Sequence, residues 1–75
     1  MNNIYELLRN QKETTLLTYI ITENKNGTIN LTISGGNRRS VQFKKVKPDD
    51  SVLICTVVDL LLEYKKYEKW LEKQK

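Results

Sequence analysis

A turn signal in the first half of the chain constrains its fold most strongly. The segment Glu23-Asn24-Lys25-Asn26-Gly27-Thr28 separates two stretches rich in Thr, Leu, Ile and Tyr, a composition typical of strands. Gly27 supplies the left-handed residue that a three-residue hairpin loop requires, in which a type I turn is followed by a G1 bulge. The sequence therefore predicts a β-hairpin in which Asn24 lies opposite Thr28.

The register of this hairpin decides which side chains share a face of the sheet. Ile21 is expected opposite Leu31, and Tyr19 opposite Ile33. A two-residue loop would instead place Thr18 and Thr22 opposite those apolar residues, so that fewer apolar side chains could be buried together. The favoured register gathers one apolar face from Leu17, Tyr19, Ile21, Ile29, Leu31 and Ile33.

A second hairpin is expected at 34–38, around Gly35 and Gly36. Beyond it, Val41 and Phe43 alternate with polar residues, which predicts a third strand near 39–46. The opposite, hydrated face of an antiparallel sheet would then carry Thr28, Asn30, Thr32, Ser40, Gln42 and Lys44.

Two helices are predicted around these strands. Asn3 and Glu6 have the spacing of a capping box, which predicts a short helix over roughly 3–11. Pro48-Asp49-Asp50-Ser51 is typical of a helix start. The segment 52–58 is β-branched and could form a strand, but a four-three apolar repeat continues well beyond it. That repeat predicts a long helix from about 50 to 73 and consists of Leu53, Val57, Leu60, Tyr64, Tyr67 and Leu71.

The order of elements predicts a single α+β domain over 1–75: a short N-terminal helix, a three-stranded antiparallel β-meander and a long C-terminal helix, arranged in two layers. The chain has 75 residues and is 39% apolar, and it contains no alanine. Every apolar residue is therefore bulky, which suits a compact core in a chain of this length.

Several function classes are excluded by what the sequence lacks. With no histidine and one cysteine, it offers neither a disulfide framework nor a cysteine-based zinc site. We expect no enzymatic activity, no metal and no cofactor. We read Cys55 as a small core residue, and Asp59 and Glu63 as a solvated carboxylate pair. No apolar run is long enough to span a membrane, and Glu6 and Arg9 interrupt any signal peptide. A cytoplasmic location in a bacterial host is expected.

A basic segment is the first candidate binding site. Five positive charges fall within ten residues that contain no acid, in a chain of net charge +4: Arg38, Arg39, Lys44, Lys45 and Lys47. Such a segment could contact nucleic acid or an acidic partner surface. Alternatively, its lysines are the solvated rim of an edge strand, where they discourage aggregation.

The end of the long helix is the second candidate site. About 24 helical residues span roughly 36 Å, whereas three strands make a sheet about 10 to 15 Å across. The helix is therefore expected to outrun the sheet, with Tyr64, Tyr67, Trp70 and Leu71 on the overhanging part. These side chains could pack on the first helix through Ile4, Tyr5 and Leu8, or they could meet a second copy or another protein. The neighbouring row of Lys65, Lys69 and Lys73 is interpreted as a solvated face that pairs with Glu68 and Glu72.

The element order is that of the double-stranded RNA-binding domain, but acids at Asp49 and Asp50 occupy the place of that domain's paired lysines. The chain more closely resembles the small phage-encoded inhibitors of Cas9, through Met1-Asn2-Asn3-Ile4, Leu7-Leu8-Arg9, the Asn-Gly hairpin and the order of elements. This resemblance implies a non-enzymatic phage or mobile-element protein, an anti-CRISPR, that inhibits a host defence effector by binding.

The best-known inhibitor of this kind is an acidic DNA mimic, whereas 38–47 is basic here. The expected partner is therefore an acidic effector surface, or the guide or target strand bound to the effector. The alternative function is that of a small DNA- or RNA-binding accessory protein whose 34–47 hairpin lies on phosphates.

Overall fold

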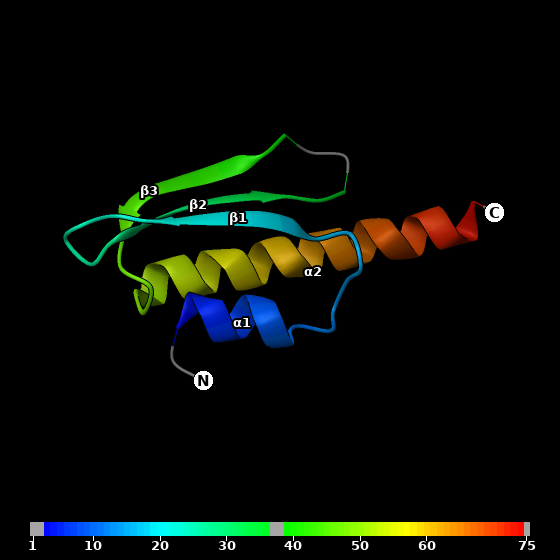
Figure 1. The fold of residues 1–75 in the computed structure, drawn as a ribbon. Coiled ribbons are helices and arrows are strands. Elements are labelled where there is room, and N and C mark those ends of the chain that lie inside the picture. Colours follow the sequence, from blue (N-terminus) through cyan, green and yellow to red (C-terminus); the bar gives the residue numbers. More distant parts are fainter. Residues whose placement is uncertain (1–2, 37–38, 75) are drawn as a thin grey trace.

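The computed structural model describes residues 3–36 and 39–74. A short helix is followed by three strands and a long helix (Figure 1). The elements are α1 Ile4–Asn10, β1 Thr18–Glu23, β2 Ile29–Ser34, β3 Val41–Val46 and α2 Ser51–Lys73. The predicted α+β class, element order and two-layer arrangement are confirmed, and α1 and β3 are each slightly shorter than expected.

The three strands form one antiparallel sheet in the order β1-β2-β3. Tyr19 pairs with Ile33 and Ile21 with Leu31, as the turn predicts. Gly27 has a φ of 86°, and the Asn24 N–H donates to the Thr28 carbonyl at 2.9 Å. The glycine-dependent loop therefore fixes the register, and apolar side chains of β2 fall on one face.

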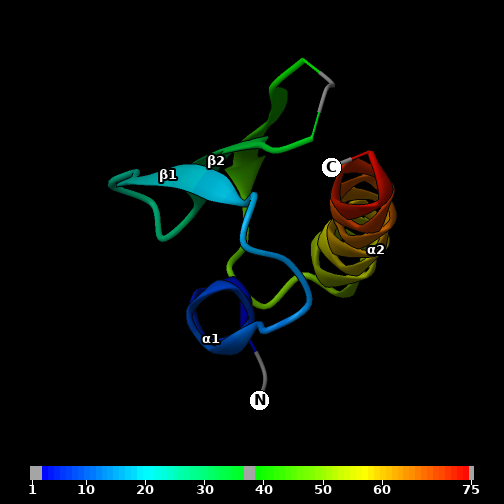
Figure 2. The same ribbon diagram turned by 90° about the vertical axis from the view of Figure 1, so that its right-hand side faces the viewer.

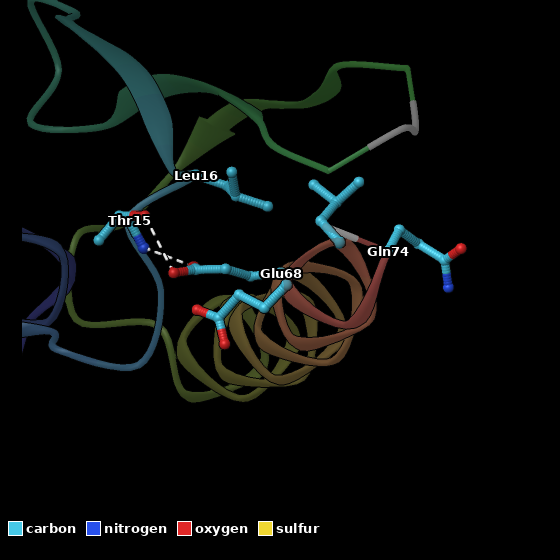
Figure 3. Close-up of a pocket in the computed structure, with 6 residues that line it drawn as sticks. Thr15, Leu16, Glu68 and Gln74 are labelled. Carbon is cyan, nitrogen blue, oxygen red and sulfur yellow. Dashed lines mark hydrogen bonds between the residues drawn. The ribbon is translucent and has the colours of Figure 1, made fainter.

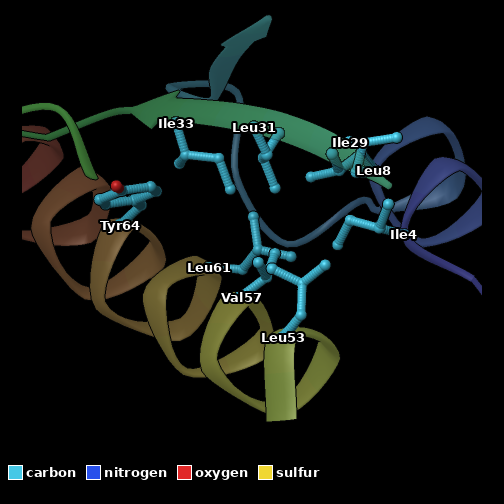
Figure 4. Close-up of a cluster of buried hydrophobic side chains, with 9 residues drawn as sticks. All are labelled: Ile4, Leu8, Ile29, Leu31, Ile33, Leu53, Val57, Leu61 and Tyr64. Carbon is cyan, nitrogen blue, oxygen red and sulfur yellow. The ribbon is translucent and has the colours of Figure 1, made fainter. Parts of the chain in front are cut away.

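Both helices cover that face, which makes two layers (Figure 2). The central strand supplies three inward side chains, and α2 supplies four that meet them (Figure 4). The buried core consists of Ile4, Leu8, Ile29, Leu31, Ile33, Leu53, Val57, Leu61 and Tyr64. Each Å² of apolar surface removed from water stabilises the folded state by about 25 cal/mol. Burial of this single cluster is therefore the main source of stability for so short a chain.

Helix caps hold the two helices in place. The Asn3 side chain accepts from the Glu6 N–H at 3.0 Å, and Asp50 accepts from Val52 N–H at 2.8 Å. The Ile4 N–H donates to the carbonyl of Pro48 at 2.7 Å. This last bond joins the start of α1 to the loop before α2, so the two helices begin at the same end of the molecule.

A β-bulge in β3 is the main feature that the sequence did not predict. Leu31 pairs with Phe43 and Ile29 with Val46, so two β3 residues lie between these pairs where β2 has one. Lys45 has a φ of 55°, a left-handed conformation rare for a residue other than glycine. The bulge brings Val46 back to the core face, where it packs against the cluster.

One expectation about burial is wrong, and one residue of the inner face is only partly covered. Cys55 is exposed, because each helical residue turns the side chain by about 100° and Cys55 lies two positions from both Leu53 and Val57. Tyr19 shares the inner face with Ile21 but is 40% exposed, because β1 is an edge strand and only β2 is covered from both sides.

Candidate functional site

The basic residues that the structure describes lie along β3 and its flanks. Lys44 and Lys45 are in the strand, while Arg39 precedes it and Lys47 follows it. All four are exposed, and we call them the basic edge. Arg38, the fifth residue of the predicted site, lies outside the described residues. The structure therefore brings four of the five predicted charges to one edge of the sheet.

The basic edge lacks carboxylate partners. Within the described ranges, no Asp or Glu forms an ion pair with any of its four cations. The nearby Asp50 carboxylate is turned to the start of α2, where it accepts from Val52 and Leu53 N–H groups. The edge spans roughly 25 Å at about 3.3 Å per strand residue. Its positive charge is thus available to an external partner.

An asparagine pair fixes the backbone in the middle of this edge. Asn30 Oδ1 accepts from the Lys45 N–H at 3.0 Å, and the side chains of Asn30 and Asn24 exchange hydrogen bonds of 3.3 Å. The bulge at Lys45 is thereby tied to the central strand and to the first turn. The sequence signal was the lone asparagine among threonines on the outer face, but it gave no hint of a bulge.

The predicted aromatic site divides into a buried and an exposed part. Tyr64 is 2% exposed and belongs to the core, so its assignment to a partner surface is wrong. A Cβ built on Gly35 would lie 2.8 Å from the Tyr64 ring, and one on Gly36 would lie 3.3 Å from the Tyr67 ring. The glycines of the second hairpin therefore pack directly on the helix and cover Tyr64. The cover therefore comes from the hairpin and not from α1 (Figure 4).

The last turns of α2 extend past the sheet, as predicted (Figure 1). Tyr67 and Trp70 stack with ring centroids 5.7 Å apart, and Trp70 is 52% exposed. We call these two residues the aromatic pair. Because a rigid, half-exposed tryptophan is a favoured interface anchor, the pair is the second surface able to hold a partner.

Leu71 lies in an open groove of about 520 Å³ near the end of α2 (Figure 3). The groove is lined by Thr15, Leu16, Glu68, Leu71, Glu72 and Gln74. Leu71 follows Tyr67 by one helical turn and lies on the same side of α2, whereas Trp70 does not line the groove. The structure does not bring the four predicted residues into one surface.

The charged row on α2 holds the chain that leads into β1. Glu68 accepts from the Thr14 hydroxyl at 2.5 Å and from the Thr15 N–H at 2.8 Å, and Lys65 pairs with Glu13 at 2.7 Å. The Thr14 hydroxyl, followed by the two Thr15 donors, lowers the pKa of the Glu68 carboxyl, and Lys65 lowers the pKa of Glu13. Lys65 and Glu68 therefore bond to the 13–15 segment, and the predicted pairing between the lysine row and Glu68 is wrong for these two residues.

An exposed apolar residue of the sheet was missed. Ile20 is 65% exposed on the outer face of the sheet, where it pairs with Thr32. The predicted register already implied this position, because Ile20 must share the face of Thr32.

The described chain contains no cluster of three or more potential metal ligands. Nor does any described helix have the length and apolar character needed to cross a membrane. Comparisons with protein-family models, with curated proteins and with solved structures find no match to this chain.

Proposed function

We propose that this chain is a non-enzymatic binding protein that inhibits a host nucleic-acid-targeting defence system, and that its basic edge contacts phosphates within the effector's nucleoprotein complex. The observation that carries the proposal is the row of cations at Arg39, Lys44, Lys45 and Lys47, which form no ion pair with any described carboxylate. The resemblance of the sequence to small phage-encoded Cas9 inhibitors supports the biological role.

Phosphate contact suits this edge better than base recognition does. Its roughly 25 Å length matches the rise of about seven base pairs. The outer face beside it carries Thr32, Gln42 and Lys44 but no aromatic side chain, so it has no platform on which bases could stack. Binding is therefore expected to depend on charge and to show little sequence preference.

The aromatic pair supports a protein contact in addition to the basic edge. An exposed tryptophan stacked on Tyr67 gives an inhibitor a second anchor for the protein part of the complex. An accessory protein that binds naked DNA or RNA would need only the basic edge. The experiment below distinguishes this alternative function from inhibition of a nuclease.

The test compares two triple variants with the wild type. Lys44, Lys45 and Lys47 are changed to Gln in the first variant, and Lys66, Lys69 and Lys73 in the matched control. Each variant lowers the net charge from +4 to +1 (4 − 3). Binding to duplex DNA, single-stranded DNA and RNA is measured by fluorescence anisotropy, and inhibition by target cleavage with an RNA-guided nuclease.

The proposal predicts that the first variant loses inhibition and the control retains it. Saturable, edge-dependent binding to naked nucleic acid without inhibition of any nuclease would instead assign the accessory role. Equal activity of the two variants in both assays would contradict both functions.

A further inference from the structure

The two edges of the sheet differ in how they are protected. β3 is blunted by the bulge at Lys45 and by its lysines, which are the usual devices against edge-to-edge pairing. β1 has the sequence Thr-Tyr-Ile-Ile-Thr-Glu over Thr18–Glu23. It has neither proline, lysine nor a bulge, and its residues favour strands. One edge is closed to pairing and the other is open.

The open edge presents backbone groups that have no partner in the described chain. Asn24 and Thr28 form a hydrogen-bonded pair, and such pairs alternate along an antiparallel ladder. Thr22, Ile20 and Thr18 therefore bond to β2, which leaves the N–H and C=O groups of Tyr19, Ile21 and Glu23 pointing outward. No described backbone or side-chain group bonds to them.

The side chains on this edge match a second copy of themselves. In an antiparallel pair centred on Ile20, Ile20 meets Ile20, Tyr19 meets Ile21 and Thr18 meets Thr22. The five residues carry no charge, and every apolar side chain meets an apolar one. A register shifted by two residues would place Tyr19 opposite Glu23 and Ile20 opposite Thr22.

We propose that β1 pairs with β1 of a second copy about a two-fold axis at Ile20, which joins two three-stranded sheets into one. The pair Ile20–Ile20 is then a close, non-hydrogen-bonded pair, and it covers the most exposed apolar side chain of β1. The outward groups of Tyr19 and Ile21 form four new backbone bonds across the axis. Both cores lie on the same side of the joined sheet.

The charged residues at the two ends of the β1–β1 pair are compatible with this register. Lys25, exposed in the turn after β1, comes beside Thr15 of the second copy. The carboxylates of Glu13 and Glu68 lie at that segment, together with the ammonium groups of Lys65 and Lys69. Lys25 therefore has carboxylates of the second copy nearby at each end, and no two like-charged residues of the strands lie opposite each other.

Sedimentation velocity over about two decades of protein concentration tests the proposal by mass action. The wild type is expected to shift from monomer to dimer. Ile20→Lys places two ammonium groups opposite each other and is expected to remain monomeric, at an exposed position where it leaves the fold intact. Gln42→Lys, on the same face of β3, adds the same charge and should still dimerise.

Amide hydrogen exchange gives a second readout that does not depend on a variant. Exchange at the Tyr19 and Ile21 amides is expected to slow at least about 10-fold as concentration rises, while α2 amides do not change. A wild type that stays monomeric, or a dimer that survives Ile20→Lys, would overturn the proposal. So would a dimer that dissociates on Trp70→Ala, because it would use the end of α2 instead.

The proposal is independent of the proposed function. The Lys44, Lys45 and Lys47 triple variant should dimerise like the wild type, because none of these residues lies on β1. A result that contradicts phosphate contact by the basic edge therefore does not contradict the dimer, and a result that contradicts the dimer does not contradict phosphate contact.

Discussion

Two glycines decide how closely the second hairpin approaches the long helix. The Gly35 backbone lies against the face of the buried Tyr64 ring, and Gly36 lies against Tyr67. Any side chain at these positions would have to displace aromatic carbons that are already packed. The lack of side chains at Gly35 and Gly36 therefore allows the end of β2 to pack closely on α2.

Gly35→Ala is expected to destabilise the protein by about 1 to 3 kcal/mol, because the new methyl group meets ring atoms of Tyr64. Urea unfolding measures the change. In a Tyr64→Leu background the cost should shrink, since the ring atoms are gone. Gly27→Ala, which has open space but a φ of 86°, should cost the same in both backgrounds.

Lys45→Gly is expected to stabilise the protein by about 0.5 to 1 kcal/mol, as relief of the left-handed conformation exceeds the entropic cost of glycine. Lys44→Gly removes the same charge from the other residue of the bulge, which does not have a positive φ, and should destabilise. Equal effects of the two substitutions on the urea midpoint would show that the bulge does not hold Lys45 in a strained conformation.

Single residues also mark the limits of sequence-based prediction. Gly27 predicted its own turn and register, because the hairpin is local and its chemistry is specific. Lys45 gave no sign of a bulge, since the need for one arises from keeping Val46 on the core face opposite Ile29. Gly35 predicted a hairpin but not its packing against Tyr64, because that contact joins distant parts of the sequence.

At the scale of elements, α2 organises the molecule. Its first half packs under β2 and beside α1, and its second half holds the chain that enters β1 through Glu68 and Lys65. The four-three repeat predicted this helix and its length. It misassigned Tyr64, because the length of helix covered by the sheet could not be judged without the packed hairpin end.

The Glu68 contact makes stability depend on pH. Its carboxyl has a pKa lowered in the folded state from an ordinary value of 4.5. The stabilisation is therefore present above that value and is lost as pH falls through the lowered folded-state pKa. Glu68→Gln is expected to lower the urea midpoint near neutral pH and to approach the wild type in acid.

The control for this prediction is Glu72→Gln on the same helix. It removes the same charge without removing a bond to Thr14 or Thr15 and should differ little from the wild type at any pH. A Glu68→Gln variant whose deficit stays constant down to the acid limit would contradict the role of the ionised carboxylate.

At the scale of the whole molecule, the fold presents its two candidate surfaces on different layers. The basic edge belongs to the sheet, and the aromatic pair belongs to the overhang of α2. The sequence predicted the fold well because turns, caps and helical repeats are local signals. It predicted the candidate surfaces less completely, since exposure depends on which layer covers each residue.

Trp70→Ala is expected to reduce inhibition by at least about 10-fold, as loss of an interface anchor does. Its effect on unfolding should stay within about 0.5 kcal/mol, because the side chain is half exposed. Leu62→Ala truncates another exposed apolar side chain on α2 and should inhibit normally. Full inhibition by Trp70→Ala would show that the aromatic pair is not part of the binding surface.

The salt dependence of nucleic-acid binding tests the central claim most directly. If three or four edge cations contact phosphates, duplex affinity should fall about 40- to 150-fold between 50 and 200 mM salt. The Lys44, Lys45 and Lys47 variant should lose most of this dependence by anisotropy, while the Lys66, Lys69 and Lys73 control keeps it. Identical salt slopes for the two variants, or no binding by the wild type at either salt, would contradict phosphate contact by the basic edge.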